Sequence, residues 1–308
     1  MSNFSDLGEV RYPECFIGED LLSNRKQRRH RRTVLFVGAT AVLLEVLSWF
    51  TGLIATGAWH VGARVLFSIA IGFLGWELLV SSSKKLEVPW YDARAAAESI
   101  KTVFWRYLTQ AEPFGSTKSR TESEEQLYRR IEEVLRGLGK TPRSRDLLVG
   151  SESLDWAWAA RTAPLAKRID LYVRSRVADQ KGWYVAKSAT LRVYARRASA
   201  IAILAAFVAL VLSIVSFWND SAGGWSEVSF EVSVVVFGYA SIRNYSRDSR
   251  VYEFTAQEIE SAASQIHSGL SQQEWAELVD EIEEVFSREH VTWQASHSGE
   301  IRRPKFHS

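Results

Sequence analysis

Long apolar blocks interrupt an otherwise densely charged chain, and four of them approach the length of a membrane span. They cover about 34–57, 61–81, 198–218 and 226–242. A helix needs about 20 apolar residues to cross a hydrocarbon core of about 30 Å, and the turns between paired blocks are short. Because backbone amides inside lipid must bond within their own helix, the pattern predicts two helical hairpins in a membrane.

The second and fourth blocks are less apolar than the other two. They contain Arg64, Glu77, Glu227 and Glu231, which a lipid-facing helix rarely tolerates. The alternative is a soluble all-helical protein that buries the four blocks as core helices. Core helices of soluble proteins usually end sooner, so the length of the blocks favours the membrane interpretation.

Basic residues predict the orientation of the hairpins. A run from Arg25 to Arg32 precedes the first hairpin and Lys84 follows it, whereas the tips at 56–62 and 219–227 contain no Lys or Arg. By the positive-inside rule, both termini and the middle of the chain are expected in the cytoplasm. The basic run is interpreted as an anchor to anionic lipid; a nucleic-acid patch is the alternative, and no nucleic-acid partner is expected.

The remaining sequence predicts cytoplasmic helices that form a bundle. Ser271 and Glu274 form a capping box, which marks one helix start. Pro164 is a favourable first residue for another helix, which runs to the end of the third block. The other helices are expected at 90–109, 127–138 and 251–266, and the capped one at 271–293. We therefore predict an all-α membrane protein with a first unit at 1–110, a linker at 111–160 and a second unit at 161–308.

Several helical segments resemble a known family. The block RVADQKGWYVAKSATLRVYARRA, Arg176 to Ala198, leads directly into a hairpin, as at the entry of a SLATT (SMODS and SLOG associating two-transmembrane effector) domain. The segment Trp90 to Tyr107 resembles the helix after the spans in another branch of that group. The segment EVFSREHVTW, Glu284 to Trp293, is similar to the closing helix of the second unit. The resemblance covers most of the chain as two tandem units.

The resemblance implies a function that composition alone does not. It implies an oligomeric effector of a bacterial conflict system that forms pores in, or disrupts, the inner membrane. The expected partners are membrane lipid, further copies of the chain, and a nucleotide second messenger or the protein that makes it. A non-conducting membrane scaffold for a cytoplasmic partner and a small ion or proton transporter remain as alternatives.

Small residues recur on one face of the first and third blocks. Gly38 and Gly52 belong to the first face, and Ala202 and Ala209 to the second. Small residues let helix backbones approach closely in lipid. These faces are expected to pack helices together, either within one chain or between copies.

Glu45 lies near the middle of the first block. A carboxylate at that depth must be paired, protonated, or face water or protein. One interpretation places Glu45, Ser48 and Glu231 along a water-accessible path through an assembled complex. The other is a protonated Glu45 that bonds to Ser48 or to a neighbouring helix.

The helix that enters the third block mixes basic and aromatic residues. Such a mixture can hold a phosphate and stack on a base, or it can anchor the helix at lipid headgroups and pack on a second helix. The residues expected to form this sensor or contact are Arg176, Asp179, Gln180, Trp183, Tyr184 and Lys187.

Catalytic and metal-binding signals are absent from the sequence. There is no glycine-rich phosphate loop, and the six histidines show no ligand spacing with carboxylates or with the single cysteine, Cys15. The carboxylates Glu281, Glu283 and Glu284 are interpreted as a solvated helix face. We therefore expect no enzyme activity, no cofactor and no metal.

Overall fold

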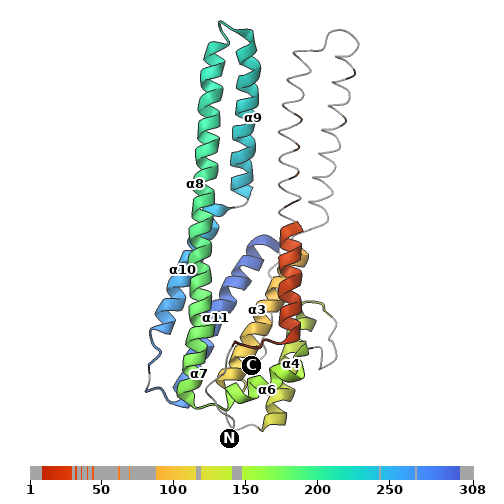
Figure 1. Cartoon of the computed structure of the whole chain (residues 1–308), viewed down its shortest axis with the longest axis vertical. Coiled ribbons are helices and arrows are strands. Elements are labelled where there is room, and N and C mark those ends of the chain that lie inside the picture. The colour runs from red at the N-terminus through yellow and green to blue at the C-terminus, as the bar shows by residue number, and fades with distance from the viewer. Residues whose placement is uncertain are drawn as a thin grey trace. The chain divides into compact units, whose positions relative to one another are not determined.

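The computed structural model describes residues 9–29, 88–115, 119–140, 148–242, 244–267 and 269–298, and single positions between 32 and 69. All regular structure within these residues is helical (Figure 1). A helix covers 14–29. The later elements are α3 (Val88–Thr109), α4 (Arg120–Gly137), α6 (Ser151–Arg161), α7 (Leu165–Tyr172), the π-helical η1 (Val173–Val177), α8 (Ala178–Val215), α9 (Asp220–Ile242), α10 (Tyr245–Ala263) and α11 (Gln272–Ser298).

The chain forms two compact units that interleave in sequence. Unit 1 contains Met1–Gln27, Glu87–Ala186 and Tyr252–Ser308, and unit 2 contains Arg28–Leu86 and Lys187–Val251. The first and second halves of the chain therefore each contribute to both units. Helices α8 and α10 begin in one unit and continue into the other.

Helix α3 is the core of unit 1. From Asp92 to its end it has no exposed residue, and Ile100, Phe104 and Trp105 are fully buried. A helix that is buried on all sides needs neighbours around its whole circumference. Trp105 packs edge-on against Tyr172 with ring centroids 5.5 Å apart, which joins α3 to α7.

The surrounding helices each bury one face. Helix α4 buries Leu127, Ile131 and Leu135 at intervals of four residues. It starts earlier than the expected 127–138, because Ser119 and Glu122 form a capping box. Helix α6 and the helix over 14–29 were not expected from the sequence.

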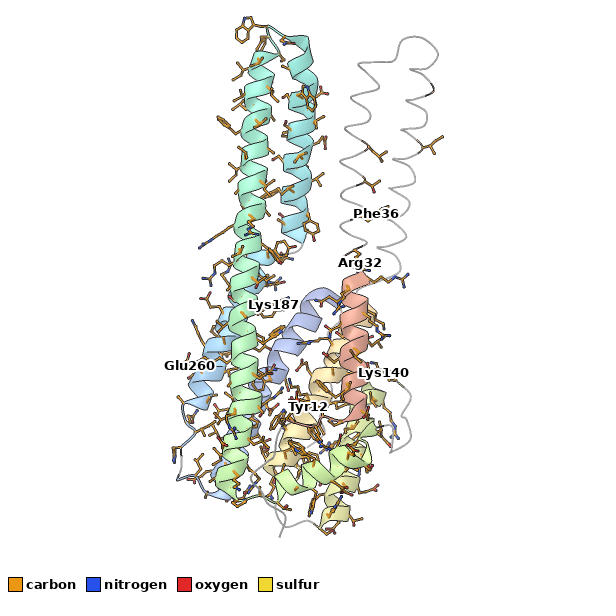
Figure 2. The ribbon with its side chains drawn as sticks, viewed as in Figure 1. Tyr12, Arg32, Phe36, Lys140, Lys187 and Glu260 are labelled. Carbon is orange, nitrogen blue, oxygen red and sulfur yellow. The ribbon has the colours of Figure 1, made fainter. Side chains whose placement is uncertain are left out.

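The segment before the helix over 14–29 packs against the rest of unit 1. The Tyr12 ring lies 6.0 Å from the ring of Phe104, and Ser153 Oγ donates a hydrogen bond of 3.2 Å to the Tyr12 carbonyl. Figure 2 marks the position of Tyr12. Lys140 forms an ion pair with Glu19 on the helix itself. Side-chain contacts therefore hold both the residues before the helix over 14–29 and the helix itself.

The long helix expected from Pro164 is present. Pro164 is its N-cap, and helical residues continue from Leu165 to Val215 through the π-turn η1, which the sequence pattern does not predict. Among the described residues this is the one helix that is long and apolar enough to cross a membrane. Its apolar part is exposed, with Ile203 at 70% and Leu204 at 63%, which is unlike a soluble core helix.

The prediction of four spans is thus supported for one helix. Most of the first expected hairpin, 34–57 and 61–81, lies outside the described residues. In the second hairpin, α8 and α9 pack through small side chains. Ser233 Oγ donates to the Ala202 carbonyl at 2.9 Å, and Ser226 Oγ donates to the Ala209 carbonyl at 2.7 Å. Alanine allows this approach because it has no side chain beyond Cβ.

Candidate functional site

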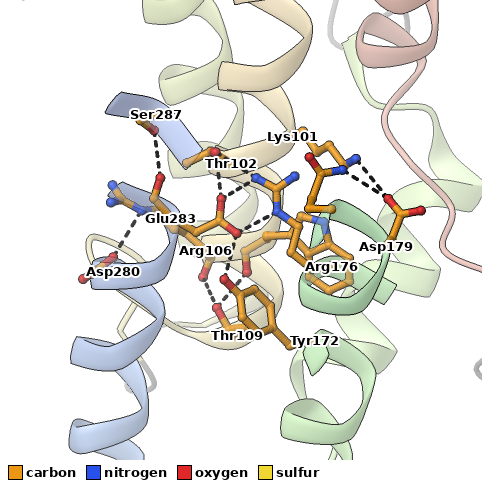
Figure 3. A network of polar contacts seen from close by, with 12 residues as sticks. Lys101, Thr102, Arg106, Thr109, Tyr172, Arg176, Asp179, Asp280, Glu283 and Ser287 are labelled. Carbon is orange, nitrogen blue, oxygen red and sulfur yellow. Dashed lines mark hydrogen bonds and ion pairs between the residues drawn. The ribbon is translucent and has the colours of Figure 1, made fainter. Parts of the chain in front are cut away.

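Unit 1 buries one ion pair completely. Arg176 comes from η1 and Glu283 from α11, and both side chains have 0% exposure. Arg176 Nε donates to Glu283 Oε1 at 2.8 Å, and Nη2 donates to Oε2 at 2.6 Å (Figure 3). This bidentate arrangement is the strongest hydrogen-bonding geometry between a guanidinium and a carboxylate.

Two further side chains complete the site. Tyr172 OH donates to Glu283 Oε1 at 2.9 Å, and Thr102 Oγ1 donates to Oε2 at 2.7 Å. The Arg176 guanidinium also lies 4.3 Å from the ring centre of Phe286. We call Thr102, Tyr172, Arg176 and Glu283 the Arg176 network. The Glu283 carboxylate accepts four hydrogen bonds here, which offsets the cost of removing its charge from water.

Burial and charge shift the proton affinities within this network. Burial alone would lower the pKa of Arg176, but the charge and hydrogen bonds of Glu283 outweigh burial and raise that pKa. Burial raises the pKa of Tyr172, and the neighbouring Glu283 charge raises it further. Arg176 therefore stays charged and Tyr172 stays neutral, so the network is an ionic contact and not a proton-transfer site.

The network gathers segments that flank both expected hairpins. Thr102 lies on α3, after the first hairpin; Arg176 precedes the second hairpin, and Glu283 follows it. The segment before the first hairpin reaches the same region, since Lys101 Nζ lies 5.5 Å from the ring centre of Tyr12. Segments that flank both expected hairpins therefore meet at this one place in unit 1.

Lys101 is a buried cation beside the network. Its Nζ lies 3.9 Å from Asp179 and faces the rings of Tyr12 and Phe16. Burial lowers its pKa below 10.5, and the nearby Arg176 charge lowers it further, although the Glu98 and Asp179 carboxylates oppose the shift.

Replacing Lys101 with Met is expected to raise the unfolding midpoint by a few degrees at about pH 7, where the buried ammonium destabilises the fold. The wild type loses this penalty as pH rises through the lowered pKa towards 10.5. The midpoints of the two proteins should therefore converge in alkaline buffer. Thermal unfolding across a pH series measures this, and a constant difference would contradict it.

Two other buried arginines donate to carbonyls in the last turn of α3 and in the residues that follow it. Arg161 donates to the carbonyls of Tyr107 at 2.6 Å, Phe114 at 2.5 Å and Gly115 at 2.8 Å. Arg168 donates to the Thr109 carbonyl at 2.9 Å. The last carbonyls of a helix have no partner within the helix, and cations bind favourably there. Burial lowers the pKa of Arg168 to about 10, and the charge of Arg161 adds to the shift.

Some of the expected sensor residues are buried and others are exposed. Arg176 and Tyr184 are buried, and Gln180 is 8% exposed and donates to Asp179 at 3.1 Å. Trp183 is 39% exposed, with the Arg94 guanidinium 5.4 Å from its ring centre. The structure therefore places part of the set in the core of unit 1. Lys187, the last member, is the first residue of α8 in unit 2.

The three described members of the expected pore and packing set lie on unit 2. Ala202 and Ala209 lie where α8 faces α9, as described above, and Glu231 is on an exposed face of α9. Phe230 and Val234 share that face at 58% and 49% exposure. Glu45, Ser48, Gly38 and Gly52 lie outside the described residues.

One interpretation of the sequence was wrong. Glu283 is not part of a solvated face, although Glu281 and Glu284 are exposed. The signal was its position among apolar residues, because Val279 and Ile282 precede it at helical spacing and are fully buried. A carboxylate within an apolar helix face requires a buried cation, and Arg176 supplies it. Thr102 and Lys101 carried no comparable signal.

The Glu283 carboxylate offers little to an external ligand or metal. All acceptor atoms of Glu283 are engaged within the chain, and in the described ranges no group of three His, Cys, Asp or Glu side chains could hold a metal ion. What the arrangement can do is hold α3, η1 and α11 in one register.

Comparison with known proteins assigns the chain to a family. Residues 13–169 match the SMODS and SLOG-associating 2TM effector domain 3, and residues 172–293 match the SMODS and SLOG-associating 2TM effector domain 1. Searches of curated proteins and of solved structures gave no match. Thr102 lies in the first matched region, whereas Arg176 and Glu283 lie in the second. The first match also includes 111–160. The chain therefore belongs to the SLATT family, as a membrane protein with two effector domains in tandem.

Proposed function

We propose that this protein is an oligomeric, pore-forming or membrane-disrupting effector of a bacterial nucleotide-signalled conflict system. It acts in the inner membrane with both termini in the cytoplasm, and it works by assembly and not by catalysis. The observation that carries the proposal is the helix from Leu165 to Val215. One end of this helix holds the Arg176 network and the other end is an exposed apolar stretch.

A continuous helix transmits movement along its axis. Arg176 lies within the part that unit 1 encloses, and Ile203 and Leu204 lie in the part suited to lipid. A signal that alters the contacts of Arg176 would therefore reach the membrane segment without another moving part. The signal is proposed to be a nucleotide second messenger or the protein that synthesises it.

The exposed carboxylate Glu231 supports a conducting assembly. It lies on α9 away from the seam with α8, on a face that also exposes Phe230 and Val234. A carboxylate in this position is costly in lipid, so it must face water or protein in the membrane. In an oligomer, that face would form a subunit contact or the wall of a water-filled path.

The test is dye release from liposomes that contain the purified full-length chain. Dye release after addition of cyclic dinucleotides or cyclic oligonucleotides is expected, and Glu231→Gln should reduce it several-fold. The matched control is Glu281→Gln, an exposed carboxylate in unit 1. Membrane depolarisation in bacteria that express the same variants, together with Glu45→Gln, provides the cellular measurement.

The outcomes separate the proposal from its alternatives. Dye retention in every condition, with insertion confirmed, would favour a non-conducting scaffold. Ion or proton flux without any nucleotide and without dye release would favour a small transporter. Equal release by wild type and Glu231→Gln would remove this residue from the path.

A further inference from the structure

Buried residues recur at every fourth position along the first part of the long helix. The series is Arg168, Tyr172, Arg176, Gln180, Tyr184 and Ser188, each less than a tenth exposed. An α-helix has 3.6 residues per turn, so each step of four moves the buried face by about 40°. Over the five steps the face would rotate by about 200° and leave the helices on which it packs.

The π-turn η1 removes about half of this drift. The Ala178 amide bonds to the Val173 carbonyl, five residues back, so the turn holds about one residue more than an α-helical turn. One extra residue turns the following helix back by about 100°. The buried face therefore rotates by about 100° over the series instead of about 200°. Its last member, Ser188, bonds to Ser249 within unit 2. Further along, Ala202 and Ala209 are buried seven residues apart, which suits an unbroken α-helix packed on a neighbour.

The Arg176 network lies on this turn. Arg176 is inside η1 and Tyr172 is the residue before it, and both donate to Glu283 Oε1. π-helical turns are rare and occur mostly as single turns, often at functional sites. The contacts with Glu283 supply the tertiary bonds that hold this uncommon turn in place.

We propose that η1 is a register switch for α8. When Arg176 leaves Glu283, the turn closes into α-helix, and α8 rotates by about 100° and advances by about 1.5 Å relative to the helices that surround it in unit 1. Each residue of α8 then moves into the place held by its successor. The switch concerns helix register alone, so it can hold or fail whether or not the chain forms a pore.

The contact between α8 and α10 reports the register. Lys181 Nζ lies 2.7 Å from Glu260 Oε1. After the switch, Gln180 would occupy the position that Lys181 holds opposite Glu260. Two cysteine pairs, Lys181→Cys with Glu260→Cys and Gln180→Cys with Glu260→Cys, can therefore distinguish the two registers in full-length protein that also carries Cys15→Ser.

The experiment measures crosslinking by a short thiol-specific bifunctional reagent in detergent. Without further change, the 181–260 pair should crosslink several-fold more than the 180–260 pair. Glu283→Gln removes the charge that holds Arg176, and it should invert this ratio. A ratio that stays the same in folded Glu283→Gln protein would overturn the proposal.

Shortening the turn gives the decisive control. Arg174 lies within η1 with its side chain 70% exposed, and its ion-pair partner is Asp170. Deleting Arg174 removes the extra residue, so Glu283→Gln should no longer change the register and the 181–260 crosslink should return. Arg174→Ala retains the chain length and should not restore it. Equal recovery with Arg174→Ala would overturn the proposal.

A milder variant covers the case in which Glu283→Gln fails to fold. Tyr172→Phe removes one hydrogen bond to Glu283 and leaves the ion pair intact. It should increase the 180–260 crosslink by a smaller factor, and deletion of Arg174 should cancel that increase. No increase in folded Tyr172→Phe protein would count against the switch in the same way.

Discussion

Replacing Glu283 with Ala is expected to lower the free energy of unfolding by about 3–5 kcal/mol, because it leaves the Arg176 charge buried without a partner. Tyr172 and Thr102 also lose their acceptor. For a unit of this size the unfolding midpoint should fall by roughly 10 °C. Thermal unfolding in detergent, followed by circular dichroism, measures the change.

Two variants control for side effects of the Glu283 substitution. Glu284→Ala alters the adjacent exposed residue of α11 and should change stability by less than about 0.5 kcal/mol. The double variant Arg176→Met with Glu283→Leu removes both charges and should recover the part of the loss that comes from the unpaired charge, because an apolar pair of similar volume can replace a buried ion pair. The hydroxyls of Tyr172 and Thr102 still lack their acceptor in this variant. A double variant as unstable as Glu283→Ala would contradict this account.

Replacing Arg161 with Met should be the second large effect, at about 3 kcal/mol of lost stability. The guanidinium bonds to three carbonyls, of Tyr107, Phe114 and Gly115, and it is 1% exposed. Methionine fills similar space but removes the guanidinium from the Phe114 and Gly115 carbonyls, whereas the Tyr107 carbonyl keeps a bond of 3.4 Å from Gln110 N. An unsatisfied buried acceptor costs about 1–3 kcal/mol. Chemical unfolding should show a lower denaturant midpoint.

The matched control for Arg161 is Arg120→Met. Arg120 pairs with Glu124 and Asp155, but its side chain is 44% exposed. Surface ion pairs contribute about 0–1 kcal/mol, so this variant should remain close to wild type. A loss in Arg161→Met no larger than about 1 kcal/mol, as expected for Arg120→Met, would mean that the three Arg161 bonds contribute little.

Local sequence signals predicted most helices well. The box formed by Ser271 and Glu274 begins α11 as expected, with Ser271 N donating to Glu274 at 2.8 Å. Helix α3 was predicted from 90 and begins at Val88. Such signals depend on neighbours within a few residues, which the sequence displays directly. The helix at 14–29 and α6 were missed because neither has a side-chain cap or apolar period strong enough to stand out.

The candidate site was harder to predict. The sequence indicates Arg176 as a candidate sensor or contact residue because it is basic and near aromatic residues. Its partner is 107 positions away in the sequence. The charged residues beside Glu283 predict a solvated side chain. Only the fold reveals that the Glu283 side chain points into the core. Pairing across such a distance depends on how α3, η1 and α11 meet.

The sequence by itself determined the helical class, the family, and the long helix that carries an apolar stretch suited to a membrane. These follow from periodicity, from helix-start residues and from the length of apolar blocks, which are local properties. The tertiary structure decided that Arg176 and Glu283 form a buried pair and that a π-turn interrupts the long helix. It also decided that Arg161 and Arg168 bind carbonyls at and after the end of α3. Each of these depends on surfaces from distant segments, because burial of a charge and the register of a helix are set by whatever packs against it.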